Sequence, residues 1–207
     1  MKKEDNQWLS TVREIAGRSN PDEHQGEILF YGASNFYFWY EMANDLAPWR
    51  ILNHGFGGST DPDLVLFADE LLYPYAPKAV FLQTGSNDYI MREGTDAEKI
   101  AACMAYKREM LEQFRARLPH TDFVFMSGLH LPGHKEYRAL TQEINRQLSA
   151  WAQQEPQLHV VDADAMTLTG TAYHDELFVE DMIHLNHEGQ LRWAKDYILP
   201  MIETLMK

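Results

Sequence analysis

An aspartate and a histidine near the C-terminal end of the chain, Asp181 and His184, stand three positions apart. At this spacing the carboxylate can accept a hydrogen bond from one imidazole nitrogen and hold the ring in one tautomer. The other nitrogen can then act as a general base, provided that the fold brings a nucleophile to it. Ser34 follows the apolar run 27–33 and is placed to be that nucleophile. Together these residues predict acyl transfer through a serine.

Two further positions are candidate donors of hydrogen bonds to a developing oxyanion. Gly58 lies in the glycine-rich stretch 55–60, where a backbone N–H without a neighbouring Cβ can approach a substrate oxygen closely. Asn87, in the sequence Gly-Ser-Asn-Asp, carries a neutral side-chain amide that can donate. The backbone N–H of Ser34, at the start of a predicted helix, is the third candidate donor.

Each of these residues also has a structural interpretation. Ser34 suits the N-cap of the helix that follows, Gly58 suits a tight turn, and Asn87 is a common turn former. For Asp88, a structural role is favoured over a role in acid–base catalysis. A phosphate-binding loop is less favoured, because the glycine-rich stretch has neither the Gly-x-x-x-x-Gly-Lys-Ser/Thr pattern nor the dinucleotide pattern Gly-x-Gly-x-x-Gly after the first strand.

Apolar runs and helical periodicities alternate along the chain without a break in composition. Buried strands are predicted at 27–33, 50–54, 78–84, 123–126 and 158–161. Helices are predicted at 5–18, from Ser34 to Pro48, at 64–72, 95–118 and 137–151, and after Asn186. This order predicts a parallel sheet with helices on both faces, in one domain over 1–207 with an N-terminal helix within 1–20 packed on it. Ser34, Gly58 and Asn87 then follow the first three strands, at the edge where such sheets bind ligands.

The composition restricts the class of partner. The 207 residues include 31 acidic and 18 basic side chains, for a formal net charge of -13, which argues against binding to nucleic acid. The single cysteine, Cys103, excludes an internal disulfide and fits a reducing compartment. No apolar run is long enough to span a bilayer, and no signal-peptide pattern is seen, so we expect a cytoplasmic protein. The oligomeric state is not specified by the sequence.

A metal site is a weaker interpretation of the same C-terminal region. His184 and His187 have a His-x-x-His spacing, and His174, Asp175 and Glu180 stand nearby. His187 falls at the start of a predicted helix, and no cysteine or Glu-x-x-His arrangement supports a zinc site. We therefore expect no metal and no organic cofactor.

Four separated blocks of this sequence resemble the SGNH hydrolases, also called GDSL-like esterases or lipases. Gly32-Ala33-Ser34 is similar to the Gly-Asp-Ser nucleophile block, with Ala33 in place of the usual aspartate. The stretch 53–60 is similar to the block whose glycine donates to the oxyanion, and 85–88 to the Gly-x-Asn-Asp block. Asp181-x-x-His184, with the Leu-Asn-x-x-Gly that follows it, is similar to the family's final block. The blocks occur in the family's order.

The resemblance implies a three-layer α/β/α sandwich with a five-stranded parallel, flavodoxin-like sheet. It implies hydrolysis of carboxylic esters through an acyl-enzyme, with Ser34 as nucleophile, His184 as base and Asp181 as orienter. Ser34, Gly58 and Asn87 would form the oxyanion hole. The α/β-hydrolase fold is the nearest competitor, but its Gly-x-Ser-x-Gly elbow is absent, and its acid usually lies on a different loop from the histidine.

We expect the substrate to be a small-molecule ester and favour small or short-acyl esters, including acetylated sugars and lysophospholipid-like molecules. Tyr89 and His130 follow strand ends and are candidate substrate contacts, with simple packing as the alternative. The aromatic run 36–40 is expected to form helix core rather than a lipid slot. Loops that shape the pocket are expected at 36–40, 88–95, 128–136 and 163–180.

Two alternative functions stay open at this point. A flavodoxin-like sheet also suits a nucleotide- or flavin-binding module, which a co-purified nucleotide or a yellow colour would reveal. A catalytically silent interaction domain could keep the same fold. The second alternative gives no physical reason for Ser, Asn, Asp and His to stand together at strand ends.

Overall fold

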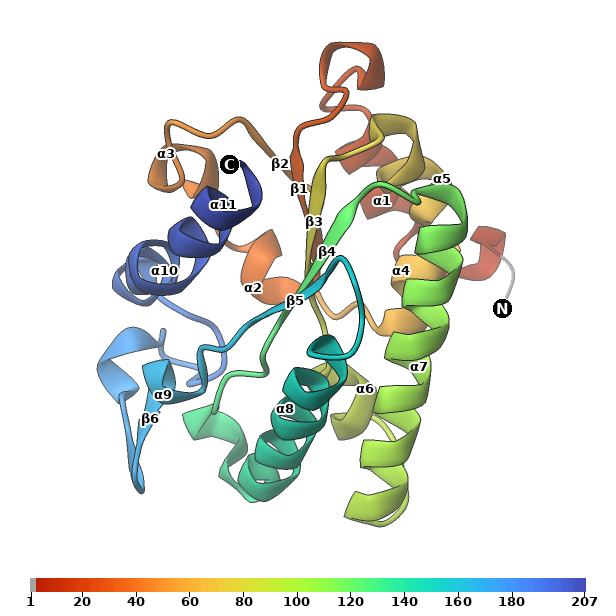
Figure 1. Ribbon diagram of the computed structural model, residues 1–207. Helices are drawn as coiled ribbons and strands as arrows, with labels where there is room; N and C mark the ends of the chain where they lie inside the picture. Colours follow the sequence, from red (N-terminus) through yellow and green to blue (C-terminus); the bar gives the residue numbers. More distant parts are fainter. Residues whose placement is uncertain (1–2) are drawn as a thin grey trace.

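Residues 3–207, described by a computed structural model, contain a five-stranded parallel sheet (Figure 1). The strands are β1 (Ile28–Gly32), β2 (Ile51–Asn53), β3 (Ala79–Gln83), β4 (Asp122–Met126) and β5 (Leu158–Val161). Their spatial order is β2-β1-β3-β4-β5, which is the flavodoxin-like order. The predicted α/β class, the five parallel strands and their order are therefore confirmed.

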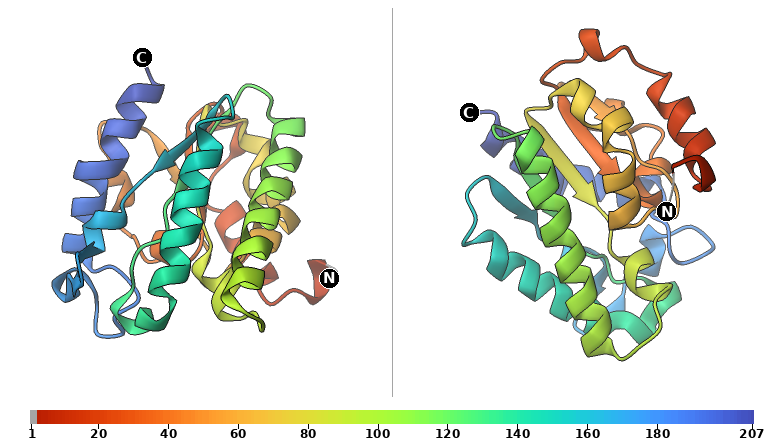
Figure 2. Two further views of the ribbon diagram at one scale, coloured as in Figure 1. Left: turned by 60° about the horizontal axis from the view of Figure 1, so that its bottom comes forward. Right: turned by 90° about the vertical axis from the view of Figure 1, so that its right-hand side faces the viewer.

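Helices cover both faces of the sheet, as the views in Figure 2 show. One face carries α1 (Leu9–Ala16), α4 (Asp61–Leu66), α5 (Ala68–Leu71), α7 (Asp96–Arg117) and α8 (Arg138–Ala152). The other face carries α2 (Ser34–Tyr37), α3 (Met42–Asp45), α10 (His187–Trp193) and α11 (Leu199–Leu205). Shorter turns are η1 (Lys3–Asp5), η2 (Pro21–Glu23), η3 (Tyr73–Tyr75), α6 (Ser86–Ile90), η4 (Pro132–Tyr137), α9 (Asp164–Thr167), η5 (Asp175–Leu177) and the π-helical η6 (Ala194–Ile198).

Both faces of the sheet are buried because each strand sends alternate side chains to opposite apolar layers. In β1, Leu29 and Tyr31 pack in the layer that contains α7. Ile28 and Phe30 pack in the layer that contains α10. This two-sided burial explains why the strand appears in the sequence as an unbroken apolar run rather than as an alternation.

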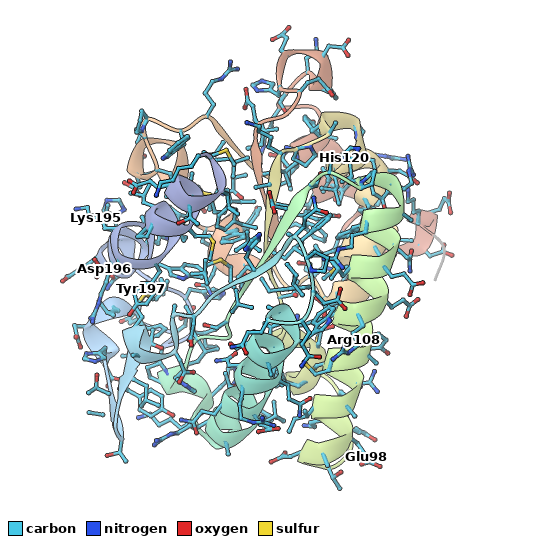
Figure 3. The ribbon with its side chains drawn as sticks, viewed as in Figure 1. Glu98, Arg108, His120, Lys195, Asp196 and Tyr197 are labelled. Carbon is cyan, nitrogen blue, oxygen red and sulfur yellow. The ribbon has the colours of Figure 1, made fainter. Side chains whose placement is uncertain are left out.

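Two predicted helix caps are confirmed. Glu98 is labelled in Figure 3 near the start of α7. There the Thr95 hydroxyl accepts a hydrogen bond from the Glu98 N–H, and the Glu98 carboxylate accepts one from the Thr95 N–H at 2.8 Å. At the start of α10, the Asn186 side chain accepts from the Gly189 N–H at 3.0 Å. Each side chain satisfies backbone donors that have no partner inside the helix.

The single helix predicted from Ser34 to Pro48 is wrong, because the chain forms two short helices there, α2 and α3. The Asn53 amide donates to the Phe36 carbonyl at 2.8 Å and occupies an acceptor that a continuing helix would need. Trp39 is still buried, so the apolar stripe remains in the core although the helix breaks.

The N-terminal helix is shorter than the predicted 5–18, and it packs Val12 and Ile15 into the layer that contains α7. Residues 1 and 2 of the predicted N-terminal segment lie outside the described residues. A small antiparallel hairpin, β6 (Leu168–Thr169) with β7 (Ala172–Tyr173), was not predicted, since strands of two residues leave no periodicity. Within 3–207, no helix combines the length and apolar character needed to cross a membrane.

We predict that Gly32→Ala lowers the free energy of unfolding by about 1–3 kcal/mol, the usual cost of overpacking. A Cβ at Gly32 would collide with the backbone carbonyl of Gln83 in the neighbouring strand β3, which cannot move aside cheaply. Urea denaturation measures the change. Gly57→Ala is the control, because a Cβ there meets its nearest atom at 3.6 Å, an ordinary contact. Equal stability of the two variants would contradict the prediction.

Candidate active site

Four of the predicted site residues line one cavity of about 490 Å³: Ser34, Gly58, Asn87 and His184. Ser34 is the first residue of α2 and follows β1, and Asn87 lies in α6 after β3. Gly58 comes from the connection between β2 and α4, and His184 from the loop before α10. The carboxyl ends of the parallel strands therefore bring these side chains together, in the way expected for sheets of this order.

The Asp181–His184 pair is built within one short turn. Asp181 Oδ2 lies 2.6 Å from His184 Nδ1, and Asp181 Oδ1 accepts the backbone N–H groups of Ile183 at 2.8 Å and His184 at 2.9 Å. Met182 adopts a left-handed backbone with φ +58°, which lets the chain fold back over so few residues. Burial alone would raise the pKa of Asp181, but the hydrogen bonds from His184 and Ile183 lower it below the usual range. Asp181 is thus held as a carboxylate against the imidazole.

The turn that holds His184 is tied to the turn that holds Ser34. Asn35 Oδ1 accepts a hydrogen bond from the Leu185 N–H at 3.2 Å, across 150 positions of sequence. The Gly133 N–H donates to the Met182 carbonyl at 2.8 Å, which fixes the same turn from the loop after β4. Sequence reasoning missed Asn35. Its only sequence indication was a polar residue next to Ser34 in an otherwise aromatic run, and that residue is buried here.

The nucleophile candidate sits in a crowded turn. Ala33, not Ser34, occupies the N-cap position of α2, so the structural interpretation of Ser34 as an N-cap does not apply. Ala33 is 3% exposed, which shows where the aspartate usual in this block would have to fit. A Cβ on Gly57 would lie 4.0 Å from the Ser34 Cβ, so the glycine-rich stretch passes directly beside the serine.

The candidate oxyanion donors are held by specific contacts. Gly58 has φ +77°, and a Cβ there would lie 2.9 Å from the Trp8 ring, so backbone conformation and packing both require glycine. Asn87 Nδ2 donates to the Ser59 carbonyl at 3.0 Å. Because an amide nitrogen carries two N–H groups, this bond orients Asn87 while leaving the second N–H for a ligand. The Ser59 hydroxyl in turn donates to the Gly32 carbonyl at 3.1 Å, at the end of β1.

A buried polar network lies beneath these donors. Lys107 Nζ donates to Asp61 Oδ2 at 3.1 Å and to Thr84 Oγ1 at 2.9 Å, and the Thr84 hydroxyl also donates to Asp61. The Asp88 carboxylate accepts the Asp61 backbone N–H at 3.1 Å. All four residues are buried. The network joins the start of α4 to the end of β3 and to α6, which contains Asn87 and Asp88.

The charged groups in this network shift one another's pKa values. Burial and then the nearby Asp61 carboxylate raise the pKa of Asp88 to about 7. Burial alone would lower the pKa of Lys107, but the charges of Asp61 and Asp88 raise it overall. The ammonium therefore stays charged, and Asp88 is the group whose ionisation varies near neutral pH.

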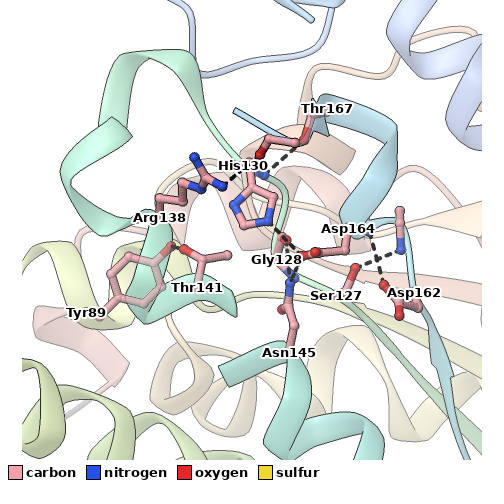
Figure 4. A network of polar contacts seen from close by, with 12 residues as sticks. Tyr89, Ser127, Gly128, His130, Arg138, Thr141, Asn145, Asp162, Asp164 and Thr167 are labelled. Atoms are coloured by element: carbon pink, nitrogen blue, oxygen red, sulfur yellow. Dashed lines mark hydrogen bonds and ion pairs between the residues drawn. The ribbon is translucent and has the colours of Figure 1, made fainter. Parts of the chain in front are cut away.

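The two candidate substrate contacts, Tyr89 and His130, do not line this cavity. Tyr89 is 4% exposed and its hydroxyl lies 2.9 Å from Thr141 Oγ1. His130 is 1% exposed, and its Nε2 lies 2.7 Å from Asp164 Oδ1 within the network drawn in Figure 4. These positions favour the packing alternative for both residues.

His187, the second histidine of the His-x-x-His spacing, begins α10 as predicted. Its Nδ1 lies 3.8 Å from Asp45 Oδ2, and the same oxygen accepts a hydrogen bond from Trp39 Nε1 at 2.7 Å. Within residues 3–207, no group of three or more His, Cys, Asp or Glu side chains has a geometry that could hold a metal ion.

Comparison with known proteins gives a family match and solved structures of similar fold. The model of the GDSL-like lipase/acylhydrolase family matches residues 23–192. No curated protein sequence gives a match. Among solved structures, a candidate acylhydrolase from Bacteroides fragilis superposes with a TM-score of 0.76 at 18% identity, over 99% of this chain and 98% of that one.

Two further structures extend the comparison. A GDSL-like lipase from Bacteroides thetaiotaomicron has a TM-score of 0.74 at 18% identity, over 96% of this chain and 98% of that one. An acetylxylan esterase from Geobacillus stearothermophilus has a TM-score of 0.62 at 18% identity, over 83% of this chain and 92% of that one. At these identities the likeness establishes the fold.

We predict that Asp88→Asn becomes more stable relative to the wild type as the pH rises from about 4 to about 7. Because the pKa of Asp88 is raised to about 7 when folded, the folded protein holds a proton there that the unfolded chain has already released. Wild-type stability therefore falls across this window through Asp88, whereas the side-chain amide of the variant cannot ionise. Urea denaturation at several pH values measures the difference.

Asp5→Asn supplies the matched control, because it makes the same change at an exposed carboxylate outside the buried network. A difference between Asp88→Asn and the wild type that stays constant from pH 4 to pH 8 would show that Asp88 has no raised pKa.

Proposed function

The chain belongs to the GDSL-like lipase/acylhydrolase family, and on that premise we propose that it is a serine esterase with Ser34 as its nucleophile. The observation that carries the proposal is that Ser34, Gly58, Asn87 and His184 line one cavity. A hydroxyl, an imidazole oriented by a carboxylate, and N–H donors from separate loops are the groups that acyl transfer requires.

In the first half-reaction Ser34 Oγ attacks the ester carbonyl carbon while His184 takes the hydroxyl proton. Since Nδ1 of His184 faces Asp181 at 2.6 Å, Nε2 is the nitrogen available to accept that proton. The carbonyl oxygen becomes an oxyanion, which accepts hydrogen bonds from the Ser34 and Gly58 backbone N–H groups and from the Asn87 amide.

Collapse of this intermediate breaks the bond between the carbonyl carbon and the alcohol oxygen. His184 returns its proton to the leaving oxygen, so that the alcohol departs neutral and the acyl group stays on Ser34. A water molecule then attacks the acyl carbonyl carbon while His184 takes its proton. The bond between that carbon and Ser34 Oγ breaks, His184 returns the proton to Oγ, and the carboxylic acid is released. Asp181 stabilises the imidazolium at both stages.

Small or short-acyl esters are the proposed substrate class. A cavity of about 490 Å³ is in the range of small-molecule sites, and Trp8, Ile90 and Leu131 give it apolar walls that suit a short acyl chain. One of the structural neighbours is an acetylxylan esterase, which supports testing acetylated sugars first. Lysophospholipid-like esters are the second group to test.

We predict that Ser34→Ala loses at least about 10³-fold in kcat/KM for 4-nitrophenyl acetate, because the nucleophile is removed. Its circular dichroism and urea midpoint should stay close to those of the wild type. A fluorophosphonate probe should label the wild type at Ser34 and leave the variant unlabelled. Retained hydrolysis in Ser34→Ala would refute the assignment, and a wild type without hydrolysis or labelling would favour a silent or nucleotide-binding domain.

We predict that Asn87→Ala lowers kcat by about 10²–10³-fold with a smaller change in KM, because the amide stabilises charge that develops only in the transition state. Steady-state kinetics with the same ester measure both constants. Asn44→Ala is the control, since Asn44 is exposed and bonds only locally to Glu41. An unchanged kcat in Asn87→Ala would remove Asn87 from the oxyanion hole.

A further inference from the structure

A second cavity, of about 610 Å³, adjoins the first, because Phe38 and His184 line both. We name it the outer groove. Its apolar surface comes from Phe38, Tyr40, Val179 and Leu185. Of the residues given catalytic roles above, His184 lines both cavities and Asp181 lines the outer groove, but the proposed chemistry gives the rest of this groove no function.

Exposed apolar side chains concentrate in the outer groove. Of the five large hydrophobic residues that are exposed in the described part of the chain, Phe38, Tyr40 and Val179 all line it. They are 39%, 80% and 41% exposed, respectively. Apolar surface that is gathered in a concave, polar-rimmed place is typical of a ligand groove rather than of ordinary protein surface.

The wall between the two cavities is fixed in place before any ligand binds. The Phe38 N–H donates to the Ser34 carbonyl at 2.9 Å, and the Phe38 carbonyl accepts from Gln190 Nε2 at 3.3 Å. The Phe38 ring meets the His184 ring edge to face, with centroids 5.0 Å apart and an interplanar angle of 77°. Because backbone and ring are both held, binding against this wall costs little ordering.

The proton transfer from His184 to the leaving oxygen indicates which part of an ester lies toward the outer groove. When the tetrahedral intermediate collapses, the carbon–oxygen bond of the ester breaks and the leaving oxygen takes its proton from His184. The oxyanion is directed instead toward Gly58 and Asn87. The alcohol portion therefore lies on the His184 side, next to Phe38, which lines both cavities.

We propose that the outer groove binds an uncharged apolar or aromatic group in the alcohol portion of the substrate, an inference that rests on the proposed esterase function. The carboxylates of Glu41 and Asp181 also line the groove, and the chain has a formal charge of -13. Like-charge repulsion therefore disfavours an anionic alcohol group such as a phosphate or carboxylate, which ranks lysophospholipid-like esters below uncharged esters among the candidate substrates.

The test compares two isomeric esters that carry the same phenyl group on opposite sides of the carbonyl. In 2-phenylethyl acetate the ring belongs to the alcohol, and in methyl 3-phenylpropanoate it belongs to the acid. We expect kcat/KM of the wild type to be at least about tenfold higher for 2-phenylethyl acetate. Adding a para-carboxylate to the alcohol ring should remove most of that advantage.

The double variant Tyr40→Ala with Val179→Thr tests whether the outer groove causes the preference. It should lower the ratio of the two kcat/KM values at least about threefold, because the ring loses apolar contacts. Met91→Ala deletes another exposed apolar side chain, 67% exposed and not part of the groove lining, and should leave the ratio unchanged.

Equal kcat/KM for the two isomers, a preference for the acid-side ring, or an unchanged ratio in the double variant would each overturn the proposal. These outcomes differ from failure of the esterase function itself. In that case the wild type would hydrolyse neither isomer, and the fluorophosphonate probe would not label Ser34.

Discussion

One buried cation supports the segments of the chain that carry Gly58 and Asn87. Lys107 lies between the start of α4 and the end of β3 and neutralises Asp61, while Asp88 bonds to the same turn. Removing either partner of such a pair would leave an uncompensated charge in the interior, which is far more costly than an exposed one. These buried contacts therefore hold the segments that carry Gly58 and Asn87 together.

The histidine loop follows a different principle. Its turn is closed by local bonds to the Asp181 carboxylate and is then attached to the rest of the site by single contacts, from Asn35 to Leu185 and from Gly133 to Met182. Asp181 and His184 are thus held together as one local unit, and hydrogen bonds to Asn35 and Gly133 position that unit relative to Ser34. This division explains how residues so far apart in sequence can form one site.

The aromatic run 36–40 shows how one segment serves both the core and the surface. Phe36 and Trp39 are fully or almost fully buried and stack near Trp193, whereas Phe38 and Tyr40 are exposed. Phe36 and Trp39 lie in the core while Phe38 and Tyr40 line the outer groove, so this one segment contributes to both.

The sequence by itself determined the order of strands and helices, the caps at Thr95 and Asn186, and the block pattern that places the chain in its family, because these depend on local periodicity and spacing. Tertiary structure alone decided that Asn53 breaks the helix and that Lys107 is buried between carboxylates. The tertiary structure also buries His130 and forms the outer groove, which Phe38 lines. Those outcomes depend on contacts between residues distant in sequence, and local sequence patterns do not specify such contacts or the burial that results from them.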